Sequence, residues 1–459
     1  MASTKKESNY FQEQSAEQAI NTKQQTQLGK NLGHFFTKHE QAKKQFSDIE
    51  MARKRAAAIK NKTLDHLDEY LLEFEKKFTA NAGQIIWADS ISDALTSIQE
   101  ILSSRGITTV VKSKSMVTEE IGLNAFLKEK NIEHWESDLG ELIQQLSNEP
   151  PFHLVTPAIH KSEEQIIELF RKFSGIQTLR SAQEVTMVAK NFLRQKFKSA
   201  GAFISGVNFM LADIGAIAIT ENEGNVLMGA NGSKLHIAIT GIEKILPSVN
   251  DLELFWPLLA SYGTGQKITS YNSIFSGPSE NEKQELILIL INNGRTDVLS
   301  QLKQRKILGC IRCGSCLNIC PVYKTIGGHA YGSVYNGPIG KALNPWMNKL
   351  EKYNHQAFAS SICGACTDAC PVNIDIHKVI LQNRQDIQTK ASETKTEKIS
   401  WYFWKEAMLS RRRMNRGGSK AKNFLMKTFF KSSWGEKRNL PVLPEKSFNE
   451  LFREKMGLK

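Results

Sequence analysis

All seven cysteines of the 459-residue chain lie between positions 310 and 370. They form two runs, Cys310-x-x-Cys313-x-x-Cys316-x-x-x-Cys320-Pro321 and Cys363-x-x-Cys366-x-x-x-Cys370-Pro371. The first run has the bacterial ferredoxin spacing, in which three thiolates bind one [4Fe–4S] cluster and the fourth reaches a second cluster. Structural zinc sites also use Cys-x-x-Cys pairs, but this tight triple spacing is not typical of them. Disulfides are disfavoured because seven is odd and nothing indicates secretion. The cysteines therefore predict iron–sulfur clusters that carry electrons.

The second run is one cysteine short, because Ser360 stands where its first cysteine would be. The ferredoxin pattern of cross-ligation assigns Cys310, Cys313, Cys316 and Cys370 to one [4Fe–4S] cluster. It leaves Cys320, Cys363 and Cys366 for the other. Three thiolates can hold either a [3Fe–4S] cluster or a [4Fe–4S] cluster with a ligand that is not cysteine. Ser360, Ser361, His329, a solvent molecule or a partner's residue would supply that ligand. The alternative is a second cluster that is labile or absent.

Composition and charge define the class of protein. Hydrophobic residues make up 41% and charged residues 23% of the chain, as in ordinary globular proteins. The polar start predicts no signal peptide, and no apolar stretch is long enough for a membrane span. Because reduced thiols persist in the cytoplasm, these features together favour a cytoplasmic protein. The net charge of +13 is uneven, since residues 391–459 hold 17 Lys and Arg against 7 Glu.

The pattern along the chain predicts four parts. Residues 1–80 read as a polar arm followed by long helices. Residues 81–299 alternate apolar runs, including 152–157, with amphipathic segments, which favours an α/β domain with a largely parallel sheet. Residues 300–385 form a small helical two-cluster ferredoxin module around a glycine-rich connection. Residues 386–459 form a basic, aromatic and helical C-terminal region.

Nucleotide-binding fingerprints do not occur in the sequence. It has neither a Gly-x-Gly-x-x-Gly motif after a strand nor a Gly-x-x-x-x-Gly-Lys-Ser/Thr motif, so we expect no dedicated flavin or NAD site. Iron–sulfur clusters pass single electrons, whereas oxidation of an organic alcohol removes two. The chain is therefore expected to work as a subunit of a larger enzyme.

Polar residues near the ends of predicted strands mark a candidate ligand site, with Asn208, Asp213 and Glu223 as its residues. Ligands of open α/β sheets bind at strand ends. The competing interpretation is ordinary turn chemistry, because Asn222-Glu223-Gly224-Asn225 makes a good turn by itself. His153, His160, His236 and His329 are expected to be structural or surface histidines, and only His329 has a position, between the cysteine runs, that makes a ligand role an alternative.

The C-terminal region interleaves cations with large aromatics, as in Trp401–Trp404 followed by Arg411–Arg413. This composition suits an anionic membrane face or an acidic partner. The alternative is a solvated basic face with no specific partner, and we do not expect this region to bind nucleic acid.

The motifs resemble a known family. Both cysteine runs and the segment Ile326–Gly340 between them resemble the iron–sulfur subunit of the bacterial lactate-utilisation complex, lactate utilization protein B. The segments at 112–124, 155–160 and 205–225 are similar to the lactate-utilisation (LUD) domain of that family.

The resemblance implies a three-layer α/β/α domain of the sugar-isomerase/CoA-transferase-like class, a two-cluster ferredoxin module and a family-specific C-terminal region. It also implies a subunit, non-catalytic or partly catalytic, that works with two companion subunits to oxidise L-lactate to pyruvate. The family's second run likewise begins at the position of Cys363, which implies a three-cysteine second cluster. Two alternatives stand beside this function. One is a CoA- or acyl-handling enzyme in which Glu223 is the nucleophile, and the other is a generic electron-transfer adaptor to a quinone pool.

Overall fold

The computed structural model describes residues 2–278, 284–347, 352–390, 395–434 and 439–457. The chain divides into two compact units, Met1–Ile387 and Gln388–Lys459. The first unit contains both cysteine runs and every strand of the described residues.

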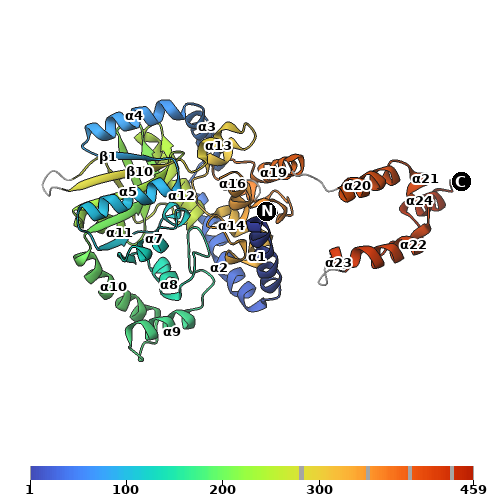
Figure 1. Cartoon of the computed structure of the whole chain (residues 1–459), viewed down its shortest axis with the longest axis horizontal. Coiled ribbons are helices and arrows are strands. Elements are labelled where there is room, and N and C mark those ends of the chain that lie inside the picture. The colour runs from blue at the N-terminus through green and yellow to red at the C-terminus, as the bar shows by residue number, and fades with distance from the viewer. Residues whose placement is uncertain (1, 279–283, 348–351, 391–394, 435–438, 458–459) are drawn as a thin grey trace. The chain divides into compact units, whose positions relative to one another are not determined.

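A six-stranded parallel sheet forms the centre of the first unit (Figure 1). Its strands, in spatial order, are β1 (Gln84–Ala88), β10 (Glu285–Ile291), β7 (Leu235–Gly241), β4 (Ala202–Gly206), β2 (Thr109–Lys112) and β3 (Glu133–Glu136). Successive side chains of a strand point to opposite faces. In β10, Leu288 therefore joins one apolar cluster and Ile289 the other. Both faces of the sheet are buried, which explains the continuous apolar runs.

The layers around this sheet confirm the predicted α/β class. Helices α5 (Ile91–Ser104) and α7 (Leu123–Glu129) cover one face. Helices α4 (Leu67–Ala80) and α11 (Asn225–Gly232) cover the other, together with a small second sheet. That sheet runs β8 (Ile245–Leu246), β5 (Phe209–Leu211), β6 (Ala216–Glu221) and β9 (Tyr271–Phe275). The remaining helices of the domain are α6 (Met116–Glu120), α8 (Leu139–Ser147), α9 (Glu163–Ser174), α10 (Ala182–Ser199), α12 (Leu252–Gly263) and α13 (Arg295–Ser300).

Helix starts in this domain follow local sequence rules. A serine precedes each of α5, α9 and α10, and its hydroxyl oxygen accepts a backbone N–H of the first turn. In return, the side chain of the third helical residue accepts the serine's own N–H; this residue is Asp93 in α5, Gln165 in α9 and Glu184 in α10. Such reciprocal capping satisfies amides that have no partner inside the helix. These helix boundaries are therefore encoded within a few residues.

The predicted strand at residues 152–157 is wrong, because the segment is irregular. The Phe152 N–H donates to the Pro157 carbonyl oxygen within the segment, at 3.0 Å, whereas the Phe152 carbonyl oxygen bonds to the cysteine module. The carbonyl oxygen of Phe152 accepts bonds from Tyr323 Oη (2.7 Å) and Asn336 Nδ2 (3.1 Å). The Phe152 side chain is buried there as well. The apolar run thus forms part of the boundary between the α/β domain and the module.

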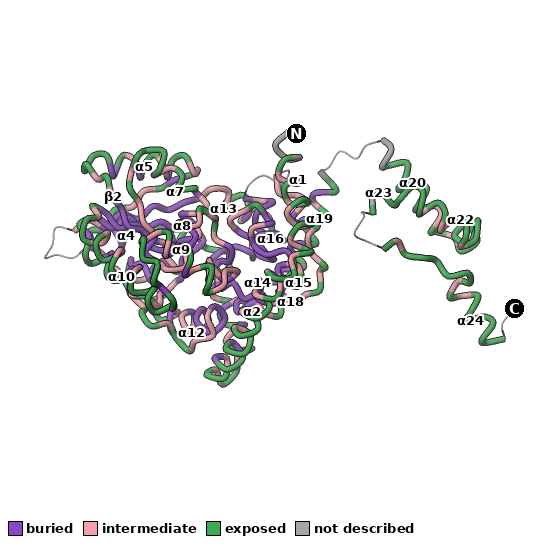
Figure 2. The backbone as a smooth tube through the Cα atoms, turned by 90° about the horizontal axis from the view of Figure 1, so that it is seen from below, coloured by how far each residue is buried: buried purple, intermediate pink, exposed green. Residues whose placement is uncertain are grey.

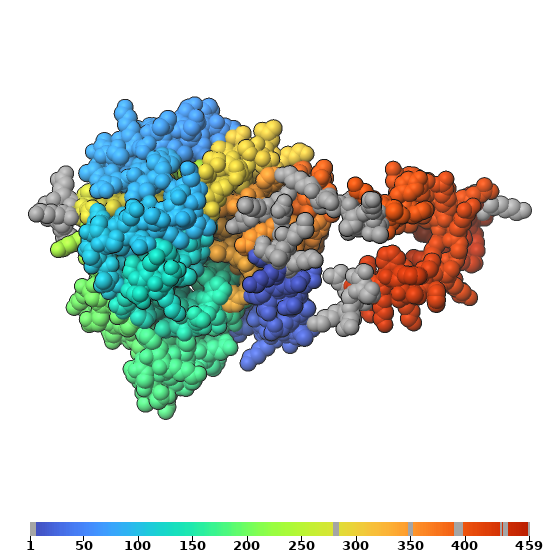
Figure 3. Space-filling model, in the orientation of Figure 1, coloured from blue at the N-terminus to red at the C-terminus, as the bar shows by residue number. Residues whose placement is uncertain are grey.

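The N-terminal helices pack on the cysteine module. They are α1 (Ala2–Gln18), α2 (Thr22–Lys43) and α3 (Ile49–Asp65), and Figure 3 shows the first of these, in dark blue, against the orange module. From α3, the buried guanidinium of Arg53 donates to the carbonyl oxygens of Cys370 (3.0 Å) and Asp368 (2.8 Å). A cation at a helix C-terminus offsets the helix dipole. Residues 1–65 therefore support the fold of the module.

The module itself consists of short helices. They are α14 (Ser315–Ile319), α15 (Pro321–Ile326), α16 (Gly337–Met347), α17 (Asn354–Phe358), α18 (Ala365–Asp368) and α19 (Ile376–Lys390). Its interior is continuous with the helices α2, α3 and α12 in one apolar cluster. Figure 2 shows this buried core as purple tube beneath α14 and α16.

The second unit contains α20 (Lys395–Met408), α21 (Arg411–Met414), α22 (Gly418–Leu425), α23 (Lys431–Trp434) and α24 (Phe448–Met456). Its large aromatic side chains are exposed, with Trp401 at 61% and Phe403 at 66%. Throughout the described part of the chain, no helix has the length and apolar character needed to traverse a bilayer.

Candidate functional site

Four cysteines of the module line one small cavity: Cys310, Cys313, Cys316 and Cys370. Most of the other residues around it are apolar, and three of the four cysteines are buried. The backbone N–H groups of Arg312 and Ile374 each point at a sulfur, Cys310 Sγ and Cys370 Sγ, at 3.4 Å. Burial raises the pKa of Cys370 to about 12. Thiolates in such a place require a cation that compensates their charge, so the donor set fits iron.

The other three cysteines, Cys320, Cys363 and Cys366, line a second cavity together with Ser360 and Ser361. Cys363 is exposed, whereas the other two are buried. The backbone N–H of Ala365 and the hydroxyl of Ser361 lower the pKa of Cys363. The two serines suggested as ligands thus lie at this cavity. His329 does not, because its Nε2 bonds to the carbonyl oxygen of Pro150 at 2.8 Å and its ring packs on Phe152.

Both cysteine runs have positive φ angles at two corresponding positions. Arg312 and Gly314 in the first run have φ angles of 60° and 75°, and Ile362 and Gly364 in the second have 56° and 85°. A positive φ is rare for a β-branched residue such as isoleucine. The same positive φ at Arg312 in one run and at Ile362 in the other indicates that the cysteine site imposes the loop geometry. In this correspondence Ser360 occupies the place of Cys310.

Beside the first cavity lies a group of buried ionic side chains with more cations than anions. The cations are Lys60, Lys244, Arg295 and Arg312, and the carboxylates are Glu120 and Glu243. Burial lowers the pKa of Lys244 to about 7 and that of Lys60 to about 8. Against the cost of its own burial, Glu243 is held at a pKa of about 2 by Arg295 and Arg312. Buried charge without compensation is costly. An anionic cluster with four thiolates would supply the missing negative charge.

A similar argument applies to the second cavity. Lys341 on α16 is fully buried, and its Nζ lies 3.9 Å from Cys320 Sγ. Burial lowers its pKa, and the thiolates of Cys320, Cys366 and Cys316 act in the opposite direction. Among the described residues Lys341 has no carboxylate in ion-pair contact. The cysteine sulfurs are thus its counter-charge.

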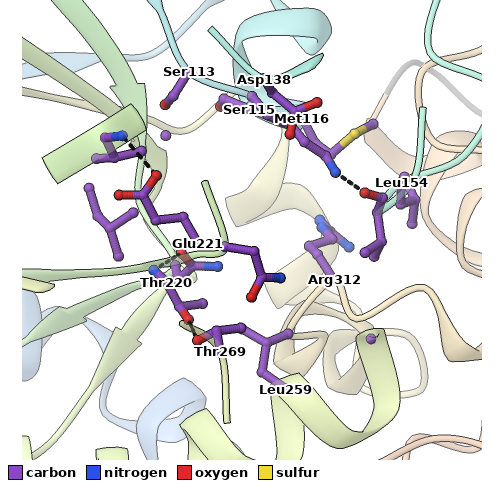
Figure 4. Close-up of a pocket in the computed structure, with 18 of the residues that line it drawn as sticks. Ser113, Ser115, Met116, Asp138, Leu154, Thr220, Glu221, Leu259, Thr269 and Arg312 are labelled. Carbon is purple, nitrogen blue, oxygen red and sulfur yellow. Dashed lines mark hydrogen bonds between the residues drawn. The ribbon is translucent and has the colours of Figure 1, made fainter. Parts of the chain in front are cut away.

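A larger cavity of about 430 Å³ lies at the carboxyl ends of the parallel strands. Ser113–Ser115 follow β2, Asp138 follows β3, and Gly206–Asn208 end β4. This is the edge where open α/β sheets bind ligands, and the volume suits a small organic molecule. Figure 4 shows Arg312, from the cysteine loop, pointing into the space between Asp138, Glu221 and Leu259. The cavity therefore lies between the α/β domain and the first cysteine run.

Two of the three suggested ligand residues line this cavity. Asn208 accepts the Thr220 N–H at 3.0 Å, and burial raises the pKa of Glu223, with the nearby Asp138 charge adding to the effect. Asp213 lies elsewhere, because its carboxylate accepts the Val249 N–H at 3.0 Å at the start of a short 3-10 helix. Its role in the fold is to position that turn.

Sequence reasoning did not single out Arg312, Lys114, Lys244 or Lys341. A signal was present for two of them. Arg312 is a cation between two cysteines, and Lys341 directly follows the glycine-rich connection. A charged residue is rarely buried unless it is paired, so a cation within an apolar or cysteine-rich segment indicates a nearby negative charge. Lys114 and Lys244 depend on distant strands meeting, for which the sequence carries no local sign.

Family comparisons agree with this arrangement. A family model described as LUD domain matches residues 71–299, and one described as 4Fe-4S dicluster domain matches residues 306–374. A solved structure of a DUF162 family protein from Deinococcus radiodurans matches 49% of this chain and 98% of its own, at 11% identity and a TM-score of 0.28.

Curated relatives extend over most of the chain. Lactate utilization protein B of Shouchella clausii is 37% identical over 91% of this chain and 91% of its own length. The proteins of the same name from Bacillus cytotoxicus and Bacillus pumilus are 39% and 36% identical, over 77% and 90% of this chain and 76% and 90% of their own lengths. With an α/β LUD domain followed by a 4Fe-4S dicluster domain, this chain belongs to the lactate utilization protein B family.

Proposed function

We propose that this chain is the electron-transfer iron–sulfur subunit of a multi-subunit complex that oxidises L-lactate to pyruvate. Cys310, Cys313, Cys316 and Cys370 would hold one [4Fe–4S] cluster. Cys320, Cys363 and Cys366 would hold a second cluster, either [3Fe–4S] or [4Fe–4S] with Ser360, Ser361, a solvent molecule or a partner's residue as the further ligand. Clusters bound there accept and pass on single electrons. Two companion subunits would complete the complex.

The observation that carries this proposal is the position of the loop between Cys310 and Cys313. Its residues Ile311 and Arg312 line both the large cavity and the first cysteine cavity. At the second cysteine cavity, Cys363 is exposed. The chain therefore offers a ligand cavity at one side of its cysteine sites and a solvent-accessible thiol at the other. This arrangement suits a protein that takes electrons at one place and delivers them to a partner at another.

Anaerobic purification tests the proposal directly. The chain should contain about seven or eight iron atoms and a similar amount of acid-labile sulfide. Together with its companion subunits it should couple L-lactate oxidation to reduction of a dye. About four iron atoms per chain, stoichiometric zinc, or a complete complex that leaves lactate unoxidised would contradict the proposal.

A second candidate, an enzyme that handles CoA or acyl groups, has one observation in its favour. Glu223 lines the large cavity, where a carboxylate nucleophile would be needed. Incubation of the chain with acyl-CoA tests this candidate, because an adduct on Glu223, detected by mass spectrometry of the intact protein, would support it and its absence would contradict it.

We also propose that residues 388–459 bind either a companion subunit or the anionic inner face of the membrane. Exposed aromatics such as Trp401, Trp404 and Phe424 lie among basic residues in this unit. Aromatic and cationic side chains together favour both kinds of surface. Such binding should weaken with salt.

A further inference from the structure

The large cavity has a cationic side and an acidic side. The basic residues on its wall are Arg312, Lys114 and Lys244. The carboxyl groups are those of Asp138, Glu221 and Glu223. Glu221 is already used, because its two oxygens accept the Val226 and Leu227 N–H groups at 2.8 and 2.9 Å. Asp138 accepts the Glu141 N–H at 3.0 Å, and Glu223 accepts the N–H of the adjacent Asn222 at 3.3 Å. The two sides would therefore bind different groups of one ligand.

Arg312 has bonding capacity to spare. Its guanidinium packs over the Tyr335 ring at 4.5 Å and lies 3.5 Å from Glu243, which is itself bonded to Arg295 at 2.6 Å. Its Nη1 is buried and has no hydrogen-bond partner in the described part of the chain. A buried donor without a partner costs about 1–3 kcal/mol, and more when it is charged. The Arg312 side chain lies on the wall of the cavity (Figure 4).

The rest of the wall indicates what kind of anion fits. Lys114 adds a second cation, although one of its three donors is bonded to the Val155 carbonyl oxygen. The carboxyl groups of Asp138 and Glu223 across the cavity would repel a highly charged ligand. A guanidinium binds a carboxylate through parallel hydrogen bonds, and a carboxyl group can share a proton with a hydroxyl or carbonyl oxygen.

We propose that this cavity binds a small organic acid, with its carboxylate on Arg312 and Lys114 and an oxygen substituent toward Glu223. The proposal rests on the proposed function, and it places the binding site for the acid in this chain instead of in a companion subunit. Arg312 lies between Cys310 and Cys313, so the bound acid would lie next to the first cysteine site. Binding should therefore be visible in the spectrum of that site.

Calorimetry on the holoprotein, purified alone without oxygen, tests the inference. L-lactate, pyruvate and the unreactive monoanion oxamate serve as probes, and acetate and inorganic phosphate serve as comparison anions. Lactate, pyruvate and oxamate should each bind at one site per chain and change the electron paramagnetic resonance spectrum of the reduced protein. Phosphate should bind more weakly than any of the three, and acetate, which lacks the second oxygen substituent, should bind more weakly too.

Three variants identify the site. Arg312→Gln should weaken binding about 10- to 100-fold, as expected when a charge-assisted hydrogen bond to a buried ion is lost. Lys114→Met, which leaves the cysteine loop untouched, should weaken it less but in the same direction. Lys303→Gln is the matched control, because Lys303 bonds to Gln382 at 3.0 Å on the surface of the module, outside the cavity. If the Arg312→Gln variant loses iron, its binding result is not used, and the affinity of the Lys114→Met variant tests the inference.

The failures of the two proposals differ. If no acid binds the isolated holoprotein while the complete complex oxidises lactate, this inference is wrong and the proposed function stands. If the acids bind and Lys114→Met weakens them, but the complex leaves lactate unoxidised, the site stands and the proposed function fails. Phosphate binding tighter than every carboxylate, or equal binding by Lys114→Met and wild type, would overturn the assignment of an organic acid to this cavity.

Discussion

Replacing Lys341 by methionine should lower the reduction potential of the second iron–sulfur centre. Lys341 is fully buried, its Nζ lies 3.9 Å from Cys320 Sγ, and its ammonium also lies over the Tyr331 ring at 5.3 Å. A fixed positive charge stabilises the reduced state of a nearby centre, because reduction adds a negative charge. Methionine keeps the length and apolar stem of the side chain but removes that charge.

The size of the effect follows from the distance. Two unit charges about 4 Å apart interact by about 4 kcal/mol at an effective dielectric constant of about 20. The added electron is spread over the cluster and so lies farther away on average, which reduces the term to about 2 kcal/mol. For a one-electron couple this corresponds to roughly 85 mV. We therefore expect the potential to fall by several tens of millivolts.

A redox titration followed by electron paramagnetic resonance measures this potential in the isolated holoprotein. Lys341→Arg should keep most of the wild-type value, because the charge remains. Lys378→Met is the control, since Lys378 is exposed on α19 and bonded to Asp375 at 2.9 Å. An unchanged or higher potential in Lys341→Met, with the second centre intact by iron analysis, would refute the reasoning.

Four further outcomes are expected. Cys320→Ser should lose the second centre and keep the first, which iron analysis and spectra of the variant can check; loss of both would contradict the assignment of ligands. The isolated chain should not oxidise lactate at a useful rate, so robust turnover by it alone would reveal a missed redox centre. Removal of the residues after 393 should keep the cluster spectrum but abolish salt-sensitive co-sedimentation with companion subunits or anionic liposomes, whereas failure of cluster assembly would mean that the region is structural. Burial lowers the pKa of His236 from 6.5 to about 3. Because only the unfolded chain then binds this proton, the free energy of unfolding should fall by about 1.4 kcal/mol per pH unit as the pH drops below 6.5. Burial also lowers the pKa of His153 to about 3, so His153 adds its own slope. His236→Gln should therefore reduce the total slope by about 1.4 kcal/mol per pH unit in denaturant titrations, and an unchanged slope would contradict the contribution of His236.

The α/β class was predictable because its signals are local. Apolar runs mark strands buried on both faces, and the capping residues of α5, α9 and α10 lie within four positions of each helix start. The same apolar composition gave a wrong strand prediction at residues 152–157. There the Phe152 carbonyl oxygen bonds to Tyr323 and Asn336, more than 160 positions away, and nothing in the segment itself reveals these partners.

The cysteine spacing by itself determined that this protein has iron–sulfur chemistry, because three ligands within seven residues can close around one cluster without help from the rest of the chain. Tertiary structure alone decided which charges surround those cysteines. Arg312 meets the sheet edge, Lys341 is buried beside Cys320, and Arg53 from the N-terminal helices bonds to Cys370. These contacts join segments far apart in the chain, and their energies depend on burial, which only the folded protein defines.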